Sequence, residues 1–177
     1  MKNKYKLIAC AGILLTGLLS GKAKAQTAIP GQLQGSVGVE ISDPTGTARI
    51  GSHFSLGGTA RLQYGLSNSF AITATSGAYH FFTIIIPGTN KRYNSYGVIP
   101  IKAGIKAFFA PHIYVGAEAG VGIEATDSGF GPDRLLLSPA LGYATQNWDF
   151  ALHYENFSST GDHYGLVALR LAYAFKL

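Results

Sequence analysis

The clearest hydrophobic pattern lies between residues 99 and 124. Aliphatic residues alternate with polar residues or glycine from Ile99 to Ala107 and again from Ile113 to Glu124, with a short turn at residues 109–112 between the two runs. A period of two places successive side chains on opposite faces of an extended strand. The pattern therefore predicts an antiparallel hairpin with one aliphatic face and one face that carries lysine and glutamate.

The same alternation recurs six more times along the chain. Strands are expected at residues 31–41, 54–66, from 70 onward, and at 135–143, 148–155 and 167–175, with short turns at 67–69 and 145–147. The segments 42–53, 87–92, 125–132 and 156–162 are polar or rich in glycine and proline, so we expect longer loops there. Segment 79–86 is apolar on both faces, and the pattern leaves open whether it extends the third strand or folds over the mouth.

Eight strands with short turns at one end and long loops at the other predict an all-β protein, an eight-stranded antiparallel up-and-down transmembrane β-barrel. The apolar face of each strand would then contact lipid, and the polar face would line a narrow lumen. Both chain ends would lie in the periplasm. The aromatic residues expected near the short-turn ends would form an interfacial girdle; they are Tyr64, Phe70, Phe109, Tyr143, Trp148, Tyr173 and Phe175.

The first 25 residues predict export. They combine a basic start, an apolar run over residues 7–19 and a small-residue cleavage site before Gln26. The apolar run is shorter than the ~20 residues that a spanning helix needs. We therefore expect a signal peptide at 1–25 and a barrel domain at 26–177. The only cysteine, Cys10, lies in the leader, so the mature chain would have no disulfide and no cysteine-ligated metal.

The formal net charge of +5 comes from the leader. Without its five lysines, nine basic and nine acidic residues remain, so the mature chain is close to neutral. Phosphate binding by nucleic-acid-binding proteins needs a basic surface, so we expect no nucleic-acid partner. The chain also shows no glycine-rich phosphate loop and no metal-ligand spacing, and no cofactor is expected.

Most charged residues within the strands fall on the face that would line the lumen. The predicted ion-pair network comprises Glu40, Arg61, Lys102, Lys106, Glu118, His153, Glu155 and Arg170, and Glu124 shares their face. If the hairpin turn centres near Pro111, Gly104 lies opposite Glu118, and Lys102 and Lys106 are its diagonal neighbours. An internal network that satisfies buried charge and plugs the lumen is the favoured interpretation, and a proton or ion path is the alternative.

The last strand resembles a known assembly signal. Leu169-Arg170-Leu171-Ala172-Tyr173-Ala174-Phe175-Lys176-Leu177 is similar to the terminal signal of bacterial outer-membrane barrels, with Tyr173 and Phe175 as its aromatic residues. The mature chain as a whole resembles the small eight-stranded porin-like family. This resemblance implies insertion by the barrel-assembly machinery with help from periplasmic chaperones. It does not identify an activity, because eight-stranded barrels host several functions.

Two functional alternatives follow from the same resemblance. Some small outer-membrane barrels modify lipid A with a histidine, a serine and an acidic residue, and His153, Glu155 and Ser158 or Ser159 lie close together in this sequence. The deacylase pattern places serine two residues after histidine, whereas Glu155 stands there. We therefore expect a monomeric barrel with a structural or cell-surface interaction role rather than an enzyme, with a lipid A-modifying enzyme or a narrow channel as the alternatives.

The predicted long loops carry both signs of charge. Basic residues on that side are Arg49, Lys91, Arg92 and Arg134, and acidic residues are Asp43, Asp127, Asp133 and Asp162. Arginine matches phosphate geometrically, so these residues could contact lipopolysaccharide in the outer leaflet. Solvated loop charge is the alternative and the favoured interpretation.

Overall fold

The structure, a computed structural model, describes residues 28–177 except 87, 90–93 and 127–128. The predicted signal peptide and the loop charges Lys91, Arg92 and Asp127 lie outside the described residues. Within them, no helix is long and apolar enough to cross a membrane.

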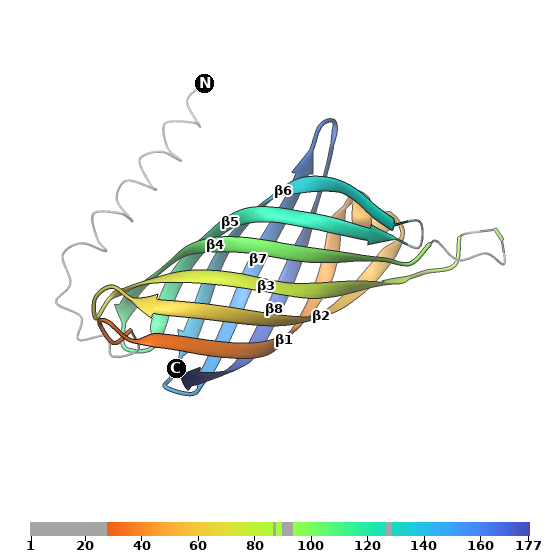
Figure 1. Cartoon of the computed structure of the whole chain (residues 1–177). Coiled ribbons are helices and arrows are strands. Elements are labelled where there is room, and N and C mark those ends of the chain that lie inside the picture. The colour runs from red at the N-terminus through yellow and green to blue at the C-terminus, as the bar shows by residue number, and fades with distance from the viewer. Residues whose placement is uncertain (1–27, 87, 90–93, 127–128) are drawn as a thin grey trace, which may run out of the picture.

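Eight strands close into one barrel (Figure 1). They are β1 (Leu33–Gly46), β2 (Ser52–Gly65), β3 (Phe70–Thr83), β4 (Tyr96–Ala110), β5 (Ile113–Thr126), β6 (Gly129–Ala144), β7 (Trp148–Ser159) and β8 (Asp162–Lys176). Each strand pairs antiparallel with its neighbours in sequence, and β1 pairs with β8 to close the barrel. This confirms the predicted all-β, eight-stranded antiparallel up-and-down architecture.

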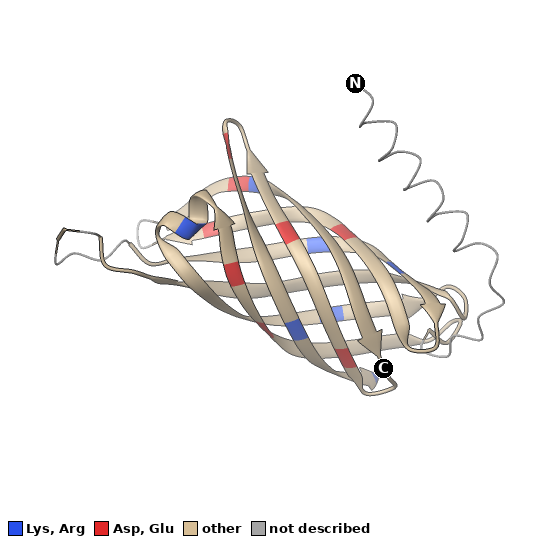
Figure 2. Cartoon of the chain, turned by 180° about the vertical axis from the view of Figure 1, so that it is seen from behind, with Lys and Arg blue, Asp and Glu red and all other residues tan. Residues whose placement is uncertain are grey.

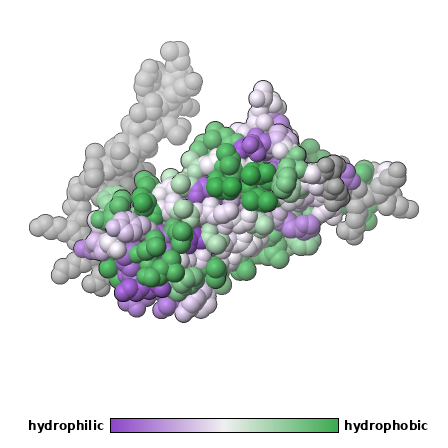
Figure 3. Space-filling model, in the orientation of Figure 1, coloured by the Kyte–Doolittle hydropathy of each residue, from purple (hydrophilic) through white to green (hydrophobic). Residues whose placement is uncertain are grey.

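Side chains alternate between the outside and the inside of the barrel, as the period of two predicts. On β1, Val39 is 56% exposed, whereas its neighbour Glu40 is 2% exposed. On β8, Leu169 is on the outside and Arg170 is buried. Hydrophobic side chains are spread along the wall of the barrel in Figure 3. The outside of this protein is therefore apolar, and its inside holds the charge.

The strands at one end are longer than the sequence pattern indicated. The predicted loops at 42–53, 125–132 and 156–162 are mostly strand, and β1 and β2 are joined by the short 3-10 helix η1 (Thr47–Ile50) and Gly51. Only the connection at residues 84–95 is long, so the predicted contrast between short turns and long loops is wrong for the other three. We call this end the loop end, and the end with the β2–β3, β4–β5 and β6–β7 connections the turn end.

Glycine and cross-strand pairing explain these longer strands. Gly46 (φ 67°), Gly129 (φ 118°) and Gly161 (φ 84°) adopt positive φ angles, which other residues rarely tolerate and which permit abrupt reversals of the chain. The polar residues of the predicted first loop continue the ladder, with Asp43 opposite Val167. A polar composition was therefore compatible with paired strand at this end of the barrel.

The apolar segment at 79–86 continues the third strand as far as Thr83. Tyr79 and Phe81 point into the barrel and are buried, whereas His80 and Phe82 lie on the outside. Of the two alternatives, the structure shows strand extension over residues 79–83. The inward aromatic pair then contributes to the apolar packing inside the loop end.

The first described residues close over part of the turn end. The Gly31 N–H donates to the Gly65 carbonyl at 2.9 Å, and the Gln32 N–H donates to the Ile29 carbonyl at 3.1 Å. A Cβ at Gly65 would lie 2.1 Å from the Ile29 carbonyl oxygen, so this approach requires glycine. Ala28 is consequently buried against inward residues of the turn end.

Candidate functional site

The eight predicted network residues all lie at inward positions; seven are buried, and the side chain of the eighth, Glu118, is 8% exposed. They come from six strands, β1, β2, β4, β5, β7 and β8, because each occupies an inward position of its strand. Figure 2 shows acidic and basic residues on strands along the length of the barrel as well as near its ends. Burial of this much charge is stable only if the charges are paired and hydrogen-bonded.

Glu118 forms the first centre of the network. The register confirms that Gly104 lies opposite Glu118. The carboxylate lies 3.1 Å from Arg61 Nη2 and 3.6 Å from Lys102 Nζ. Its other oxygen accepts hydrogen bonds from the hydroxyls of Thr73 and Thr75 at 2.9 and 2.7 Å. Glu118 therefore has two cationic partners and two neutral donors.

Asp149 forms the second centre, and the sequence analysis missed it. One carboxylate oxygen contacts Lys106 Nζ and lies 3.5 Å from both Arg61 Nη1 and Arg170 Nη1. The other oxygen accepts a hydrogen bond from the Tyr114 hydroxyl at 2.7 Å. The prediction that Lys106 is a partner of Glu118 is wrong, because its ammonium group reaches β7 instead.

The signal for Asp149 was present in the sequence. It shares the inward face of β7 with His153 and Glu155, since all three are separated by even numbers of residues. It lies close to the predicted turn at 145–147. The closed barrel instead turns it towards the axis, where it is 5% exposed.

Glu40, His153 and Glu155 form the third centre. His153 Nε2 lies 3.2 Å from Glu40 and 4.0 Å from Glu155, and the Tyr79 hydroxyl donates to Glu155 at 3.1 Å. Lys102 contacts Glu155 as well as Glu118, and Arg170 Nε lies 3.5 Å from Glu40. Lys102 and Arg170 thus join the three centres into one network.

The network balances its own charge. It contains the carboxylates of Glu40, Glu118, Asp149 and Glu155 and the cations of Arg61, Lys102, Lys106 and Arg170. Glu40, His153 and Glu155 also offer possible metal-ligand atoms within 4.8 Å of one another. Lys102 already pairs with Glu155, and Arg170 lies against Glu40. A divalent cation would therefore add uncompensated positive charge, so the three side chains are arranged as ion pairs rather than as a metal centre.

The arrangement does not assemble a hydrolytic triad among the described residues. His153 and Glu155 lie close together inside the barrel, but Ser158 donates its hydrogen bond to the Asn156 side chain at 2.6 Å. No hydrogen bond joins His153 to Ser158 or Ser159 in the described part of the chain. Nearness in sequence therefore does not bring the serine hydroxyls to the histidine.

Apolar clusters lie inside the barrel towards both ends. The cluster towards the loop end contains Ala48, Tyr79, Phe81, Val98, Leu136, Phe157, Tyr164 and Leu166, and the cluster towards the turn end contains Ala28, Ala71, Phe108, Tyr114, Ala144 and Ala151. Phe157 and Tyr164 stack with ring centroids 4.9 Å apart. The clusters border the ion-pair network and at the turn end overlap with it, because Asp149 lies opposite Ala144 and bonds Tyr114.

Arg134 is not a solvated loop charge. It lies on β6 with a 10% exposed side chain, and its Nε and Nη2 atoms lie 2.6 Å from Glu124 and 2.9 Å from Asp162. Its guanidinium also lies 5.0 Å from the centre of the Tyr164 ring. Arg49 is paired as well, at 2.8 Å from Asp43. Both described loop-end arginines thus already have carboxylate partners.

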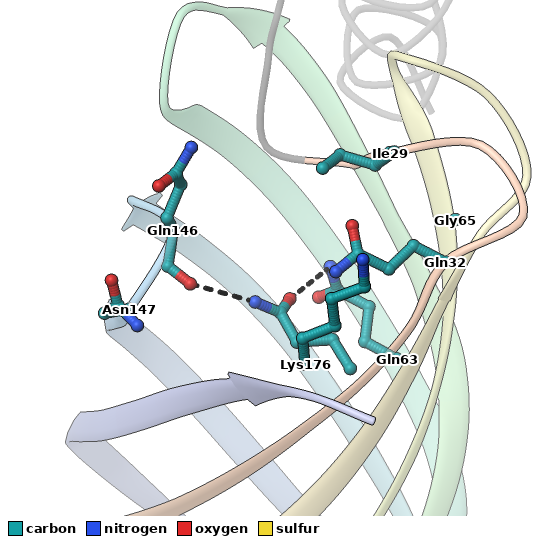
Figure 4. A pocket seen from close by; sticks show the side chains of 8 residues that line it. Ile29, Gln32, Gln63, Gly65, Gln146, Asn147 and Lys176 are labelled. Atoms are coloured by element: carbon teal, nitrogen blue, oxygen red, sulfur yellow. Dashed lines mark hydrogen bonds between the residues drawn. The ribbon is translucent and has the colours of Figure 1, made fainter.

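The turn end contains a polar pocket of about 290 Å³ (Figure 4). Its lining comprises Ile29, Gln32, Gln34, Gln63, Gly65, Gln146, Asn147 and Lys176. Gln34 donates to the Gln146 carbonyl at 3.0 Å, and Gln63 donates to the Gln34 side chain at 3.4 Å. A cavity of only about 10 Å³ lies next to Lys106 and Asp149, which is about the space of one water. The pocket therefore narrows sharply where the network begins.

Comparison with known proteins identifies the fold. Searches against protein families and against curated proteins found no match. Among solved structures, the attachment invasion locus protein Ail of Yersinia pestis has a TM-score of 0.58 at 14% identity, covering 83% of this chain and 100% of Ail. Neisserial surface protein A has a TM-score of 0.57 at 16% identity, with 81% and 97% covered.

A third structure agrees with these two. The N-terminal β-barrel domain of Pseudomonas aeruginosa OprF has a TM-score of 0.52 at 16% identity, covering 81% of this chain and 100% of that domain. Identities this low establish the fold and leave the activity open. The chain has the fold of the small eight-stranded outer-membrane β-barrels.

Proposed function

We propose that this protein is a monomeric outer-membrane β-barrel with a structural or cell-surface interaction role. The observation that carries the proposal is the distribution of side chains, with aliphatic and aromatic residues outside and ion pairs inside. A soluble barrel that binds an apolar ligand has the reverse arrangement, because water covers its outside. The aromatic residues expected in the girdle are all exposed on the outer wall; they are Tyr64, Phe70, Phe109, Tyr143, Trp148, Tyr173 and Phe175.

Fractionation of cells that express the full chain tests this location. We expect the protein in the outer-membrane fraction, released by detergent and not by high salt or alkali, because apolar burial in lipid rather than charge would hold it there. Surface labelling of intact cells should reach a cysteine introduced at Thr160 in the β7–β8 turn and not one introduced at Gln146, which would place both termini in the periplasm. A protein recovered in the soluble periplasmic fraction would contradict the proposal.

We also propose that the lumen is plugged. An eight-stranded barrel leaves an interior that side chains can fill. Here charged side chains fill the middle, and apolar clusters lie towards both ends. Opening a path would require separating ion pairs that little water screens, which supports a closed lumen over the channel alternative.

Planar bilayer recordings test the closed lumen. The purified wild-type protein, after insertion verified by protease protection, should show no stable single-channel current. If the side chains close the barrel, replacing both Arg61 and Glu118 by alanine should raise the ion leakage above that of the wild type. Steady and reproducible conductance steps from the wild type would instead support a channel.

Biogenesis and lipid partners follow from the same proposal. Tyr173 and Phe175 lie on the outer face of β8, where a terminal assembly signal would be accessible to the barrel-assembly machinery and to periplasmic chaperones. Outer-membrane lipid and lipopolysaccharide acyl chains are the expected partners of the apolar wall.

The pairing of Arg49 and Arg134 with carboxylates does not favour a phosphate site on these two arginines. A scaffold or surface-binding role is also better supported than catalysis, because the serines are not placed beside His153.

A further inference from the structure

The loop end contains a cavity of about 640 Å³ that combines aromatic rings with charged side chains. Its lining includes Tyr96, Glu124, Arg134, Asp162 and Tyr164. We propose that this cavity binds a saccharide that carries free amino groups. The inference rests on the proposed function, because only an outer-membrane barrel with this orientation exposes its loop end to sugars outside the cell.

Stacked aromatic rings support one side of the cavity. Tyr96 stacks on Phe81 with centroids 4.3 Å apart and an interplanar angle of 14°. Tyr164 packs edge-on against Phe81 at 6.3 Å and stacks on Phe157. Phe81 covers one face of the Tyr96 ring, but Tyr96 is only partly buried. The uncovered part of its ring lines the cavity. Tyr164 is 4% exposed, so Tyr96 is the ring that can contact a ligand, with Tyr164 and Phe81 behind it. A rigid tyrosine ring supplies contact area at a low entropy cost, which suits the flat C–H face of a sugar ring.

The charges beside these rings favour a cation over an anion. Arg134 forms ion pairs with Glu124 Oε1 and Asp162 Oδ2. Two carboxylates thus share one guanidinium group, and the described lining has a net charge of −1. Asp162 Oδ1 already accepts a hydrogen bond from the Thr47 hydroxyl at 3.1 Å, and Glu124 Oε1 also accepts one from the Tyr164 hydroxyl. Among the described residues no hydrogen bond reaches Glu124 Oε2, so this oxygen can accept one from a ligand. An ammonium group is attracted by this arrangement, whereas a sulfate or phosphate is repelled.

The remaining lining favours a sugar over a simple amine. The side chains of Asn94, Ser95 and Thr126 are polar and uncharged. The Ser95 hydroxyl is hydrogen-bonded to His80, and the Thr126 hydroxyl donates to the Gly129 carbonyl, but each hydroxyl oxygen can still accept a hydrogen bond from a ring hydroxyl. The volume falls within the range of roughly 300 to 1,000 Å³ that small-molecule sites occupy. A basic peptide would use the carboxylates alone, without the rings and the neutral polar groups.

Calorimetric titration tests the inference. The full-length protein in phospholipid nanodiscs would be titrated with chitotriose, whose three glucosamine rings carry free amines, at a pH at which those amines are protonated. We expect saturable binding that weakens as salt is added. Tyr96→Ala and Glu124→Gln should each weaken it about tenfold, because one removes the stacking surface and the other a charged hydrogen-bond acceptor. Phe130→Ala is the matched control, since this aromatic residue is 77% exposed and does not line the cavity.

Three comparison ligands and a folding control make the result decisive. Triacetylchitotriose lacks the amines and sucrose octasulfate is strongly anionic, so both should bind at least tenfold more weakly than chitotriose. Equal binding of triacetylchitotriose, tighter binding of trilysine, or no binding of chitotriose would each overturn the inference. Wild-type protein that inserts into nanodiscs but does not bind would refute this inference alone, whereas protein that does not insert would refute the proposed function.

Discussion

Replacing Asp149 by asparagine should lower the free energy of unfolding of the barrel by about 3 to 5 kcal/mol, the cost typical of removing one partner from a well-buried ion pair. Asp149 lies against Lys106, Arg61 and Arg170 inside the barrel. The substitution preserves the shape of the side chain but leaves the four cations of the network with three carboxylates in place of four, and it removes the carboxylate that pairs with Lys106. Little water reaches them, so the lost attraction cannot be recovered by solvation.

Equilibrium unfolding in urea, with the protein refolded into lipid vesicles, measures this effect. The single tryptophan, Trp148, lies on the outer wall beside Asp149 and reports loss of the lipid contact. Asp133→Asn is the matched control, because Asp133 is an exposed carboxylate on β6. Glu118→Gln should have a smaller effect than Asp149→Asn, since Glu118 contacts two cations rather than three. Equal stability of the Asp149 and Asp133 variants would refute a stabilising network.

Replacing Leu171 by arginine would place a charge on the lipid face, which should cost about 2 to 4 kcal/mol if the site is near the midplane of the membrane. Leu171 lies on the outer wall of β8, opposite Val39 on β1 and Phe150 on β7. Both of these neighbours are apolar and exposed on the same wall. The guanidinium group would therefore have no carboxylate nearby and would have to reach the interface.

Leu177→Arg is the control for this second prediction. Leu177 follows the end of β8 and is 59% exposed, so its substitution should cost about 0 to 1 kcal/mol, as expected near the interface. Urea unfolding in vesicles compares the two variants directly. Equal costs at both positions would contradict a lipid-facing wall, and so would a mature protein that remains soluble and monodisperse without detergent.

The arrangement of the strands was largely predictable because a barrel wall imposes one simple rule on its sequence. Each residue faces either lipid or lumen, so alternation in residues such as Val39, Glu40 and Ile41 identifies both the strand and its faces. The pairing of Gly104 with Glu118 followed from a turn centred near Pro111. Strand ends were predicted poorly, since polar residues beyond the apolar band can be either loop or paired strand.

The partners within the lumen were predictable only in part. A hairpin register relates neighbouring strands, so the contact of Lys102 with Glu118 could be anticipated from local sequence. The contact of Lys106 with Asp149 joins β4 to β7 across the barrel, and no local pattern encodes it. It depends on the diameter of the closed barrel and on how far each long side chain extends towards the axis.

The sequence by itself determined that this protein forms eight antiparallel strands with an apolar outside and a charged inside, because side-chain alternation is a local property of an extended chain. Only the tertiary structure decided which charges of non-neighbouring strands meet and that Arg134 is buried between Glu124 and Asp162. It also decided that aromatic rings and carboxylates surround one cavity at the loop end. The physical reason is closure: joining β1 to β8 sets the distances across the lumen, and those distances select the partners of inward side chains on strands that are not neighbours.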